Sequence, residues 1–393
     1  MEKRLVKVKP YILDLCDPEQ DLQESLFSLD ENSLLKLDRN EATVVPSPLV
    51  IKTISKSLDS LSLNRQPDIR TRKLRRKLSY YSGVSFDNIA CFASLTIATD
   101  TLARTYLQPG LEALIMSPSE NCFANSVVST GARLVFTRHA DIFAPTIEEM
   151  VDGINSKTRL IYIANLNSIS GALLTEAEIV FLLSYAENAI IVVDESCFEF
   201  CGATVTDLLT KYSNLVVLRT FSKAFALAGL DVSYILTDSR NLRFINRLGL
   251  DKGPNTLAQI AAESAIDDIN YTANFVRSVN ESKKMLFENL LCLGYDFRIT
   301  AANFFLLKVK DPDTLVEALT ENNIYVNNLS GVVGFEDYVR ITIGTPSQTG
   351  VLLDVLAKLS GAQTSGKDIS KTSRMTSSEL GRVFEPQEEI PVE

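Results

Sequence analysis

The chain of 393 residues contains a single histidine, His139, and no tryptophan. One histidine excludes metal sites built from several histidines, and the segment around His139 has no nucleophile-elbow pattern for a Ser-His-Asp relay. We expect His139 to be an ordinary surface or loop residue. There is no apolar run of about 18 residues, so the sequence predicts no membrane span. The opening MEKRLVKVKP lacks the apolar core of a secretory signal, and we expect none.

Basic residues are fewer than acidic ones, and there are only six cysteines. Lys and Arg number 39 against 49 Asp and Glu, which gives a net charge of −10. This balance argues against a protein that holds nucleic acid or an anionic membrane by bulk charge. The six cysteines are dispersed, and no second pair completes a metal site with Cys197 and Cys201. We therefore expect free thiols, no metal and a cytoplasmic protein.

Short apolar runs alternate with amphipathic stretches between about residues 86 and 240. Runs rich in Ile and Val are typical of strands buried on both faces, and the alternation predicts a mostly parallel sheet between two layers of helices. Thr175 is expected to cap one of these helices. The predicted strands are Leu111–Met116, Arg133–Phe136, Arg159–Asn165, Ala189–Asp194, Leu215–Thr220 and Ser233–Asp238.

The chain is long enough for two domains, and its pattern changes after about residue 268. A long charged helix ending at Gly294 precedes strands at Asn303–Val309 and Tyr338–Gly344, which indicates a small α+β domain. We expect an N-terminal arm that joins the small domain (1–45), a large domain (46–265), the small domain (266–360) and a disordered tail (361–393).

Two residues indicate chemistry before any family is considered. Asp194 ends a buried strand, where open α/β sheets place their ligands. Lys223 follows the next strand, where partial desolvation would make its amine nucleophilic. Such a pair suits pyridoxal phosphate (PLP), because the lysine can form a Schiff base while the aspartate pairs with the pyridine nitrogen. A capping aspartate and a solvated lysine remain the alternative explanation.

The segment RTFSKAFALAGL around Lys223 resembles the Schiff-base lysine motif of histidinol-phosphate aminotransferases, in the fold-type-I PLP superfamily. The resemblance runs from about residue 35 to 360 in an ordered series of segments. It implies a three-layer α/β/α large domain with a smaller α+β domain. The other matching segments are LDRNEATVVPSPLVI, LQPGLEALIMSPS, VVDESCFEF, GPNTLAQIAA, ANFFLLKV and YVRITIGTP.

The resemblance also implies roles for individual residues. Lys223 would be the Schiff-base lysine and Asp194 the partner of the pyridine nitrogen. Arg340 would grip a substrate carboxylate, a bidentate task suited to guanidinium, and Asn40 would line the substrate side. The remaining residues would contact the cofactor: Phe123 by stacking on its ring, Thr220 and Ser222 at its phosphate, and Ser168 at its ring hydroxyl.

Several positions depart from the family pattern. Ser168 replaces an asparagine and Cys197 a tyrosine near the ring, Gln66 replaces a tyrosine that reaches a neighbouring subunit, and Asp231 replaces an arginine that neutralises the phosphate. In CFASLTIATD, bulky or uncharged residues stand where small, polar or acidic ones hold the phosphate: Phe92, Leu95 and Thr96. We expect these changes to weaken PLP binding.

Three functions are compared at this point. One is a PLP-dependent aminotransferase acting as a homodimer on an amino acid or a derived amine. The alternative is a pseudoenzyme of the same fold that binds a partner or metabolite without turnover. A nucleotide-binding protein is disfavoured, because neither a Gly-x-Gly-x-x-Gly nor a P-loop motif is present.

Overall fold

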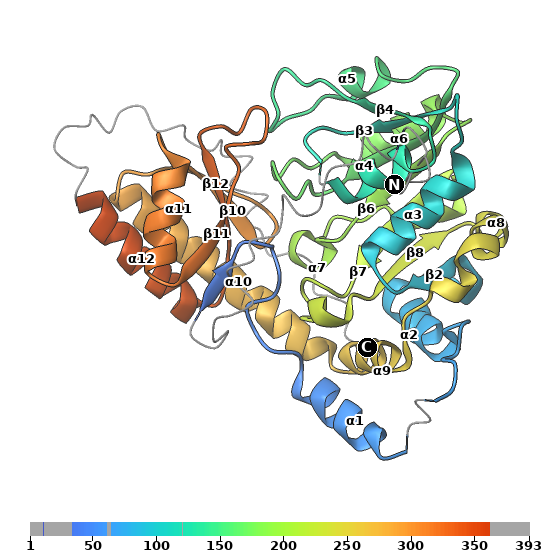
Figure 1. Cartoon of the computed structure of the whole chain (residues 1–393), viewed down its shortest axis with the longest axis horizontal. Helices are drawn as coiled ribbons and strands as arrows, with labels where there is room; N and C mark the ends of the chain where they lie inside the picture. The colour runs from blue at the N-terminus through green and yellow to red at the C-terminus, as the bar shows by residue number, and fades with distance from the viewer. Residues whose placement is uncertain (1–10, 12–33, 61–63, 120, 362–393) are drawn as a thin grey trace, which may run out of the picture.

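The computed structural model describes residues 11, 34–60, 64–119 and 121–361. Most of the predicted N-terminal arm, and all of the predicted disordered tail except residue 361, lie outside the described residues. Two β-sheets, each covered by its own helices, lie side by side (Figure 1). No helix in the described part of the chain is both long and apolar enough to cross a membrane.

The larger sheet has seven strands in the order β2-β8-β7-β6-β5-β3-β4. The five strands from β7 to β4 are parallel, whereas β8 is antiparallel to both of its neighbours. All six predicted strands are present, which confirms the α/β class. The bounds are β2 (Ile89–Phe92), β3 (Glu112–Ile115), β4 (Arg133–Phe136), β5 (Thr158–Ala164), β6 (Ile190–Asp194), β7 (Leu215–Thr220) and β8 (Ser233–Thr237).

Alternate residues of the central strands enter different hydrophobic cores. In β6, Ile191 and Val193 join one cluster while Ile190 and Val192 join the other. Successive side chains of a strand point to opposite faces, so a continuous apolar run has to be covered on both sides. The prediction of burial on both faces is wrong for β4, where Phe136 is 49% exposed because this strand forms the sheet edge.

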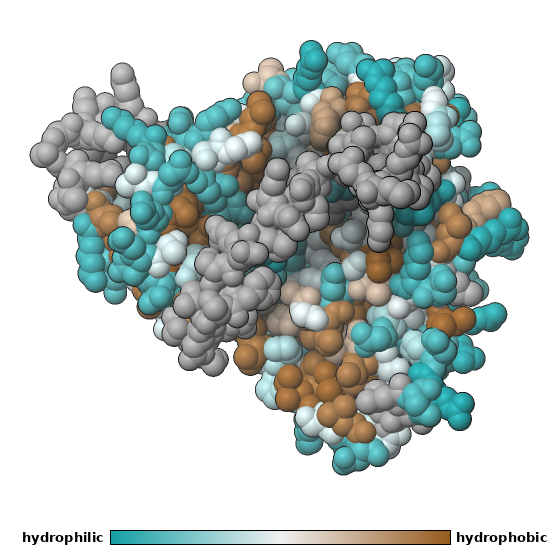
Figure 2. Space-filling view, viewed as in Figure 1, coloured by the Kyte–Doolittle hydropathy of each residue, from teal (hydrophilic) through white to brown (hydrophobic). Residues whose placement is uncertain are grey.

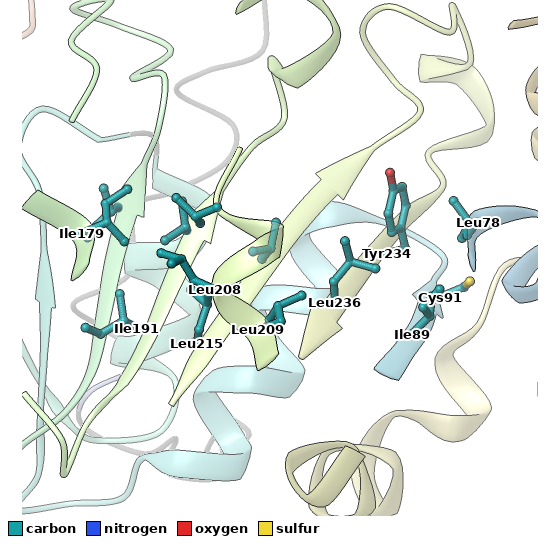
Figure 3. Packing of buried hydrophobic residues seen from close by; sticks show 14 of the residues in the cluster. Leu78, Ile89, Cys91, Ile179, Ile191, Leu208, Leu209, Leu215, Tyr234 and Leu236 are labelled. Carbon is teal, nitrogen blue, oxygen red and sulfur yellow. The ribbon is translucent and has the colours of Figure 1, made fainter. Parts of the chain in front are cut away.

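Helices cover both faces of this sheet. Figure 3 shows part of one core, in which Ile191, Leu215 and Leu236 of the sheet pack with Ile179 of α6 and Leu78 of α2. The α-helices of this part are α1 (Pro48–Leu58), α2 (Arg72–Ser82), α3 (Leu95–Tyr106), α4 (Asn121–Val128), α5 (Ile147–Val151), α6 (Glu176–Tyr185), α7 (Phe198–Cys201), α8 (Ser239–Gly249) and α9 (Thr256–Asp267). Its 3₁₀ turns are η5 (Phe86–Asn88), η6 (Thr206–Thr210), η7 (Ala228–Leu230) and η8 (Leu250–Lys252).

The cap predicted at Thr175 is confirmed. Its hydroxyl accepts a hydrogen bond from the Glu178 N–H, and the Glu178 carboxylate accepts one from the Thr175 N–H. This reciprocal capping box satisfies two backbone donors that a helix start leaves without partners. It explains why α6 begins at Glu176.

The smaller sheet has five strands in the order β1-β11-β12-β10-β9. Its first strand comes from the N-terminal part of the chain and pairs in parallel with β11, so distant segments share one sheet. Three helices accompany it, the longest being α10. The bounds are β1 (Leu35–Leu37), α10 (Ile269–Cys292), β9 (Asp296–Ile299), β10 (Phe304–Lys308), α11 (Pro312–Glu321), β11 (Ile324–Asn328), β12 (Tyr338–Thr342) and α12 (Pro346–Gly361).

His139 lies in a loop, which agrees with the prediction of a surface or loop residue. The side chain is only 1% exposed. Its Nε2 lies 2.6 Å from Thr137 Oγ1 and its Nδ1 lies 2.9 Å from a Glu149 carboxylate oxygen. Because both ring nitrogens have partners, the imidazole joins the end of β4 to α5.

A buried ion pair joins β7 to the turn after β6. Arg219 and Glu195 approach to 2.8 Å, and both side chains are almost fully buried. The guanidinium also donates to Thr204 Oγ1 at 2.8 Å and lies 3.7 Å above the Phe198 ring. Removing one partner of such a pair leaves the other charge buried without compensation, which is strongly destabilising.

We therefore expect Arg219→Met to lower the free energy of unfolding by about 3–5 kcal/mol, because Glu195 loses its counterion. Urea unfolding followed by circular dichroism measures this loss. Arg240→Met is the control, since Arg240 pairs with Asp238 in an exposed position and such pairs contribute about 0–1 kcal/mol. Equal losses in the two variants would contradict a structural role for the buried pair.

Candidate functional site

The carboxyl ends of β5, β6 and β7 lie at one edge of the larger sheet. Parallel pairing places Ala164 beside Asp194 and Asp194 beside Leu218. The loop containing Ser168 follows β5, and Lys223 lies three residues after Thr220, the last residue of β7. The structure thus brings together at this edge three of the residues named from the sequence.

The carboxylate of Asp194 is buried and hydrogen-bonded on both oxygens. Oδ1 accepts from the backbone N–H of Ser196 at 2.9 Å and from its hydroxyl, and Oδ2 accepts from the Tyr162 hydroxyl. Phe123 of α4 is fully buried and stacks on the Tyr162 ring, with centroids 4.3 Å apart and planes at 16°. Tyr162 therefore connects Phe123 to Asp194.

The Lys223 amine lies next to a thiol. Its Nζ donates to Cys197 Sγ at 3.3 Å, and the side chain is partly buried. Cys197 is the residue before α7, and Cys201 ends that helix. Burial is the main cause that raises the pKa of the Cys201 thiol to about 12, so this neighbour stays protonated near neutral pH.

A second lysine lies close to the same two cysteines. Lys283 of α10 is fully buried, and its Nζ donates to the Ala301 carbonyl at 2.8 Å. Burial lowers the pKa of its amine to about 7, and the nearby Cys201 and Cys197 oppose this shift only in part. A basic residue on the apolar stripe formed by Val279, Leu286 and Leu290 could have been noticed in the sequence.

Arg340 reaches the same edge from the smaller sheet. Its Nη1 donates to the Ser168 carbonyl at 2.8 Å and its Nη2 donates to the Asp38 carbonyl at 3.0 Å. The Asn40 amide also donates to the Ser168 carbonyl, at 3.3 Å. Arg340 and Asn40 are both buried, and they tie the smaller sheet to the loop that follows β5.

Asp231 lies at the N-terminus of α3. Its carboxylate accepts from the Ser222 hydroxyl at 3.2 Å and from the Leu95 backbone N–H. Burial raises the pKa of Asp231, and these two hydrogen bonds oppose the rise. Thr220 accepts from the Ser222 N–H at 3.1 Å, so both hydroxyl residues named from the sequence lie in this group.

Gln66 lies apart from the hydrogen-bonded groups described above. It is an exposed residue in the connection between α1 and α2. The resemblance assigned it to the site of a neighbouring subunit, and this role stays a prediction.

The chain matches one family model, described as aminotransferase class I and II, over residues 27–356. The chain belongs to this aminotransferase family. The histidinol-phosphate aminotransferase 2 of Carboxydothermus hydrogenoformans is 31% identical to it over 91% of this chain and 98% of its own length. A dihydroxyacetone phosphate transaminase of Campylobacter jejuni is 28% identical over 92% of this chain and 97% of its own length.

A solved structure of the same aminotransferase fold aligns over almost the whole chain. Histidinol-phosphate aminotransferase from Sinorhizobium meliloti, in complex with pyridoxal-5'-phosphate, superposes with a TM-score of 0.81 at 20% identity. The alignment covers 93% of this chain and 100% of that one. This alignment confirms the predicted fold, and the family match confirms the resemblance to aminotransferases drawn from the sequence motifs.

A buried carboxylate behind this edge of the aminotransferase fold titrates near neutral pH. Glu199 of α7 accepts from the Tyr81 hydroxyl at 3.0 Å. Burial raises the pKa of Glu199 to about 7, although Arg219 acts in the opposite direction. The folded chain therefore keeps a proton on Glu199 between about pH 4.5 and 7, where the unfolded chain has lost it.

Because the folded state binds more protons in that window, Glu199 makes the chain less stable as pH rises from about 4.5 to 7, by roughly 3 kcal/mol in total. Glu199→Gln keeps an acceptor for Tyr81 and should flatten this part of the pH profile. Urea unfolding at a series of pH values tests this expectation. The substitution Glu187→Gln, at an exposed position, serves as the control. If the free energy of unfolding varied with pH in the same way for Glu199→Gln and for the unsubstituted chain, the role of Glu199 would be contradicted.

Proposed function

We propose that the chain is an aminotransferase that uses a pyridoxal-type cofactor and acts on an amino acid or an amine derived from one. One observation carries the proposal. The amine of Lys223 and the carboxylate of Asp194 lie at the ends of adjacent parallel strands, and the Arg340 guanidinium reaches the same edge from the other sheet. The names of the relatives support the same chemistry.

The residues at this edge fit the ring of such a cofactor. Lys223 offers an amine for its aldehyde, and Asp194 offers a buried carboxylate for its ring nitrogen. Stacking of Phe123 on that ring stays a prediction, because the Phe123 side chain is fully buried and already stacks on Tyr162. When bound, the cofactor supplies the electron sink that makes the α-proton of an amino compound removable.

The protein residues would bind the substrate and move its proton. The Ser168 and Asp38 carbonyls fix the plane of the Arg340 guanidinium, whose rigid fork matches a carboxylate. Lys223 Nζ would take the α-proton of the substrate as a general base, because its partly buried amine lies at the same edge as Asp194 and Arg340. Tyr162 and Ser196 hold the Asp194 carboxylate in place.

Variants of Lys223 and Arg340 test this assignment with purified protein and a series of amino donors. Lys223→Ala should lower kcat by about a thousandfold or more, because the base and the cofactor anchor are lost together. Arg340→Lys should raise KM for a carboxylate-bearing donor by about tenfold to a hundredfold, since a point charge replaces a bidentate fork.

Arg240→Lys, which changes an exposed arginine in the same way, should leave both constants unchanged. A KM for Arg340→Lys equal to that of the unsubstituted chain would remove Arg340 from the substrate site. Full activity in Lys223→Ala would overturn the proposed function.

A second candidate is a non-catalytic protein of the same fold that binds a partner or a metabolite. The observation that favours it is the Asp231 carboxylate at the N-terminus of α3, where its charge opposes a phosphorylated cofactor. This candidate requires an intact fold without amine exchange for any donor. Turnover that depends on Lys223 would exclude it.

We also propose that the chain works as a homodimer. Apolar side chains are exposed on and beside α1, with Val45 71% and Ile51 51% exposed, and Figure 2 shows hydrophobic residues gathered over this helix. An apolar surface of this kind on an otherwise acidic molecule suits an isologous contact with a second copy.

Sedimentation equilibrium should therefore give a mass of twice 43.5 kDa. Ile51→Asp should shift the mass towards one chain, because it places a charge in the contact. Val351→Asp changes an equally exposed valine on α12 and should leave the dimer intact. A monomeric mass for the unsubstituted chain at micromolar concentration would contradict the proposal.

A further inference from the structure

A carboxylate of the chain itself occupies the anion position at the start of α3. The first N–H groups of a helix have no intrahelical partners and attract negative charge. Here the Leu95 N–H donates to Asp231, and the Ile97 N–H donates to the Ser94 hydroxyl at 2.9 Å. These donors are thus engaged by side chains of the chain.

The neighbouring hydroxyl groups are engaged in the same way. Ser233 donates to Thr220 at 3.2 Å, Thr220 donates to Ser222 at 3.1 Å, and Ser222 donates to Asp231 at 3.2 Å. The chain of hydroxyls therefore ends on the Asp231 carboxylate. No lysine or arginine in the described part of the chain forms an ion pair with Asp231, so nothing there compensates a second negative charge.

Apolar residues on both sides of the turn before α3 pack into the core. Phe92 is 1% exposed, and its ring lies so close to Gly249 that a Cβ there would come within 2.9 Å. Leu95 also packs against the core beneath α3. Asp231 itself has φ = 44°, a left-handed conformation that aspartate tolerates better than most residues. The donors at this turn that the structure describes are therefore already used by Asp231 and Ser94.

We propose that Asp231 takes the place of the cofactor's phosphate, so that the site selects a pyridoxal-type ring without a phosphate group over PLP. A phosphate at this point would compete for the Leu95 N–H and the Ser222 hydroxyl, and its charge of about −1.5 to −2 would lie against a carboxylate. A ring that ends in a methyl or hydroxymethyl group meets neither obstacle. The inference rests on the proposed function, because it concerns the cofactor of the same site.

Two aldehydes separate the contributions of the ring and the phosphate. PLP has both, and 5'-deoxypyridoxal has the same ring with a methyl group in place of the phosphate arm. Absorption titrations of the full-length protein with each give two dissociation constants, and Lys223→Ala identifies the band that depends on the lysine. For the unsubstituted chain, we expect the dissociation constant of 5'-deoxypyridoxal to be lower than that of PLP by about tenfold or more.

Asp231→Asn removes the charge but keeps an acceptor for Ser222 and Leu95. It should tighten PLP binding by about tenfold or more and change the 5'-deoxypyridoxal constant by less than about threefold. Asp207→Asn removes an exposed charge elsewhere and should change neither constant. The inference would be overturned if the unsubstituted chain bound PLP more tightly than 5'-deoxypyridoxal and if Asp231→Asn bound PLP more weakly than the unsubstituted chain.

A measurement that does not use the ring keeps the inference distinct from the proposed function. Melting temperatures in sodium phosphate and in sodium chloride of equal ionic strength report on the anion position alone. Asp231→Asn should be stabilised by phosphate, whereas the unsubstituted chain should not. If neither aldehyde gives a Lys223-dependent band, the proposed function fails, and with it the selection between the two rings. The phosphate comparison then decides only whether Asp231 occupies the anion position, and absence of phosphate stabilisation in Asp231→Asn would overturn that part.

Discussion

The parallel pairing of β5, β6 and β7 is the constraint on which the rest of the site depends. Backbone hydrogen bonds set the register, so Ala164, Asp194 and Leu218 end their strands side by side. Parallel strands expose their carboxyl ends at one edge, and each end opens into a loop free to carry polar residues. Lys223 and Asp194 therefore lie at the same edge of the sheet although they are 29 positions apart in the sequence.

The smaller sheet completes the site through the loop after β5. The Ser168 carbonyl accepts hydrogen bonds from Arg340 and Asn40, which belong to segments at opposite ends of the chain. The pairing of β1 with β11 brings those ends together. Arg340, which we propose as the substrate-binding residue, is therefore positioned by backbone carbonyl groups, which do not depend on side-chain rotamers.

Buried charge near the site is compensated within the chain. Arg219 neutralises Glu195, while Lys283 rests on a backbone carbonyl and has its pKa lowered by burial. The Asp231 carboxylate is likewise stabilised within the chain, because the Leu95 N–H at the start of α3 and the Ser222 hydroxyl donate hydrogen bonds to it. Under the proposal made above, the fold retains Lys223 and Asp194 while Asp231 occupies the position of the cofactor's phosphate.

The sequence by itself determined strands β3 to β8, β10 and β12, the cap at Thr175 and the pair Asp194 and Lys223, because hydrophobic runs and the residues that follow them are local features. It did not predict the short strands β1, β2, β9 and β11. It did not reveal the antiparallel direction of β8, since an apolar run does not encode strand direction. Tyr162 and Lys283 were missed because each lies within a pattern that reads as core. Only the tertiary structure decided that Tyr162 meets Asp194 and that Asp231 meets α3, because these contacts join segments far apart in the chain.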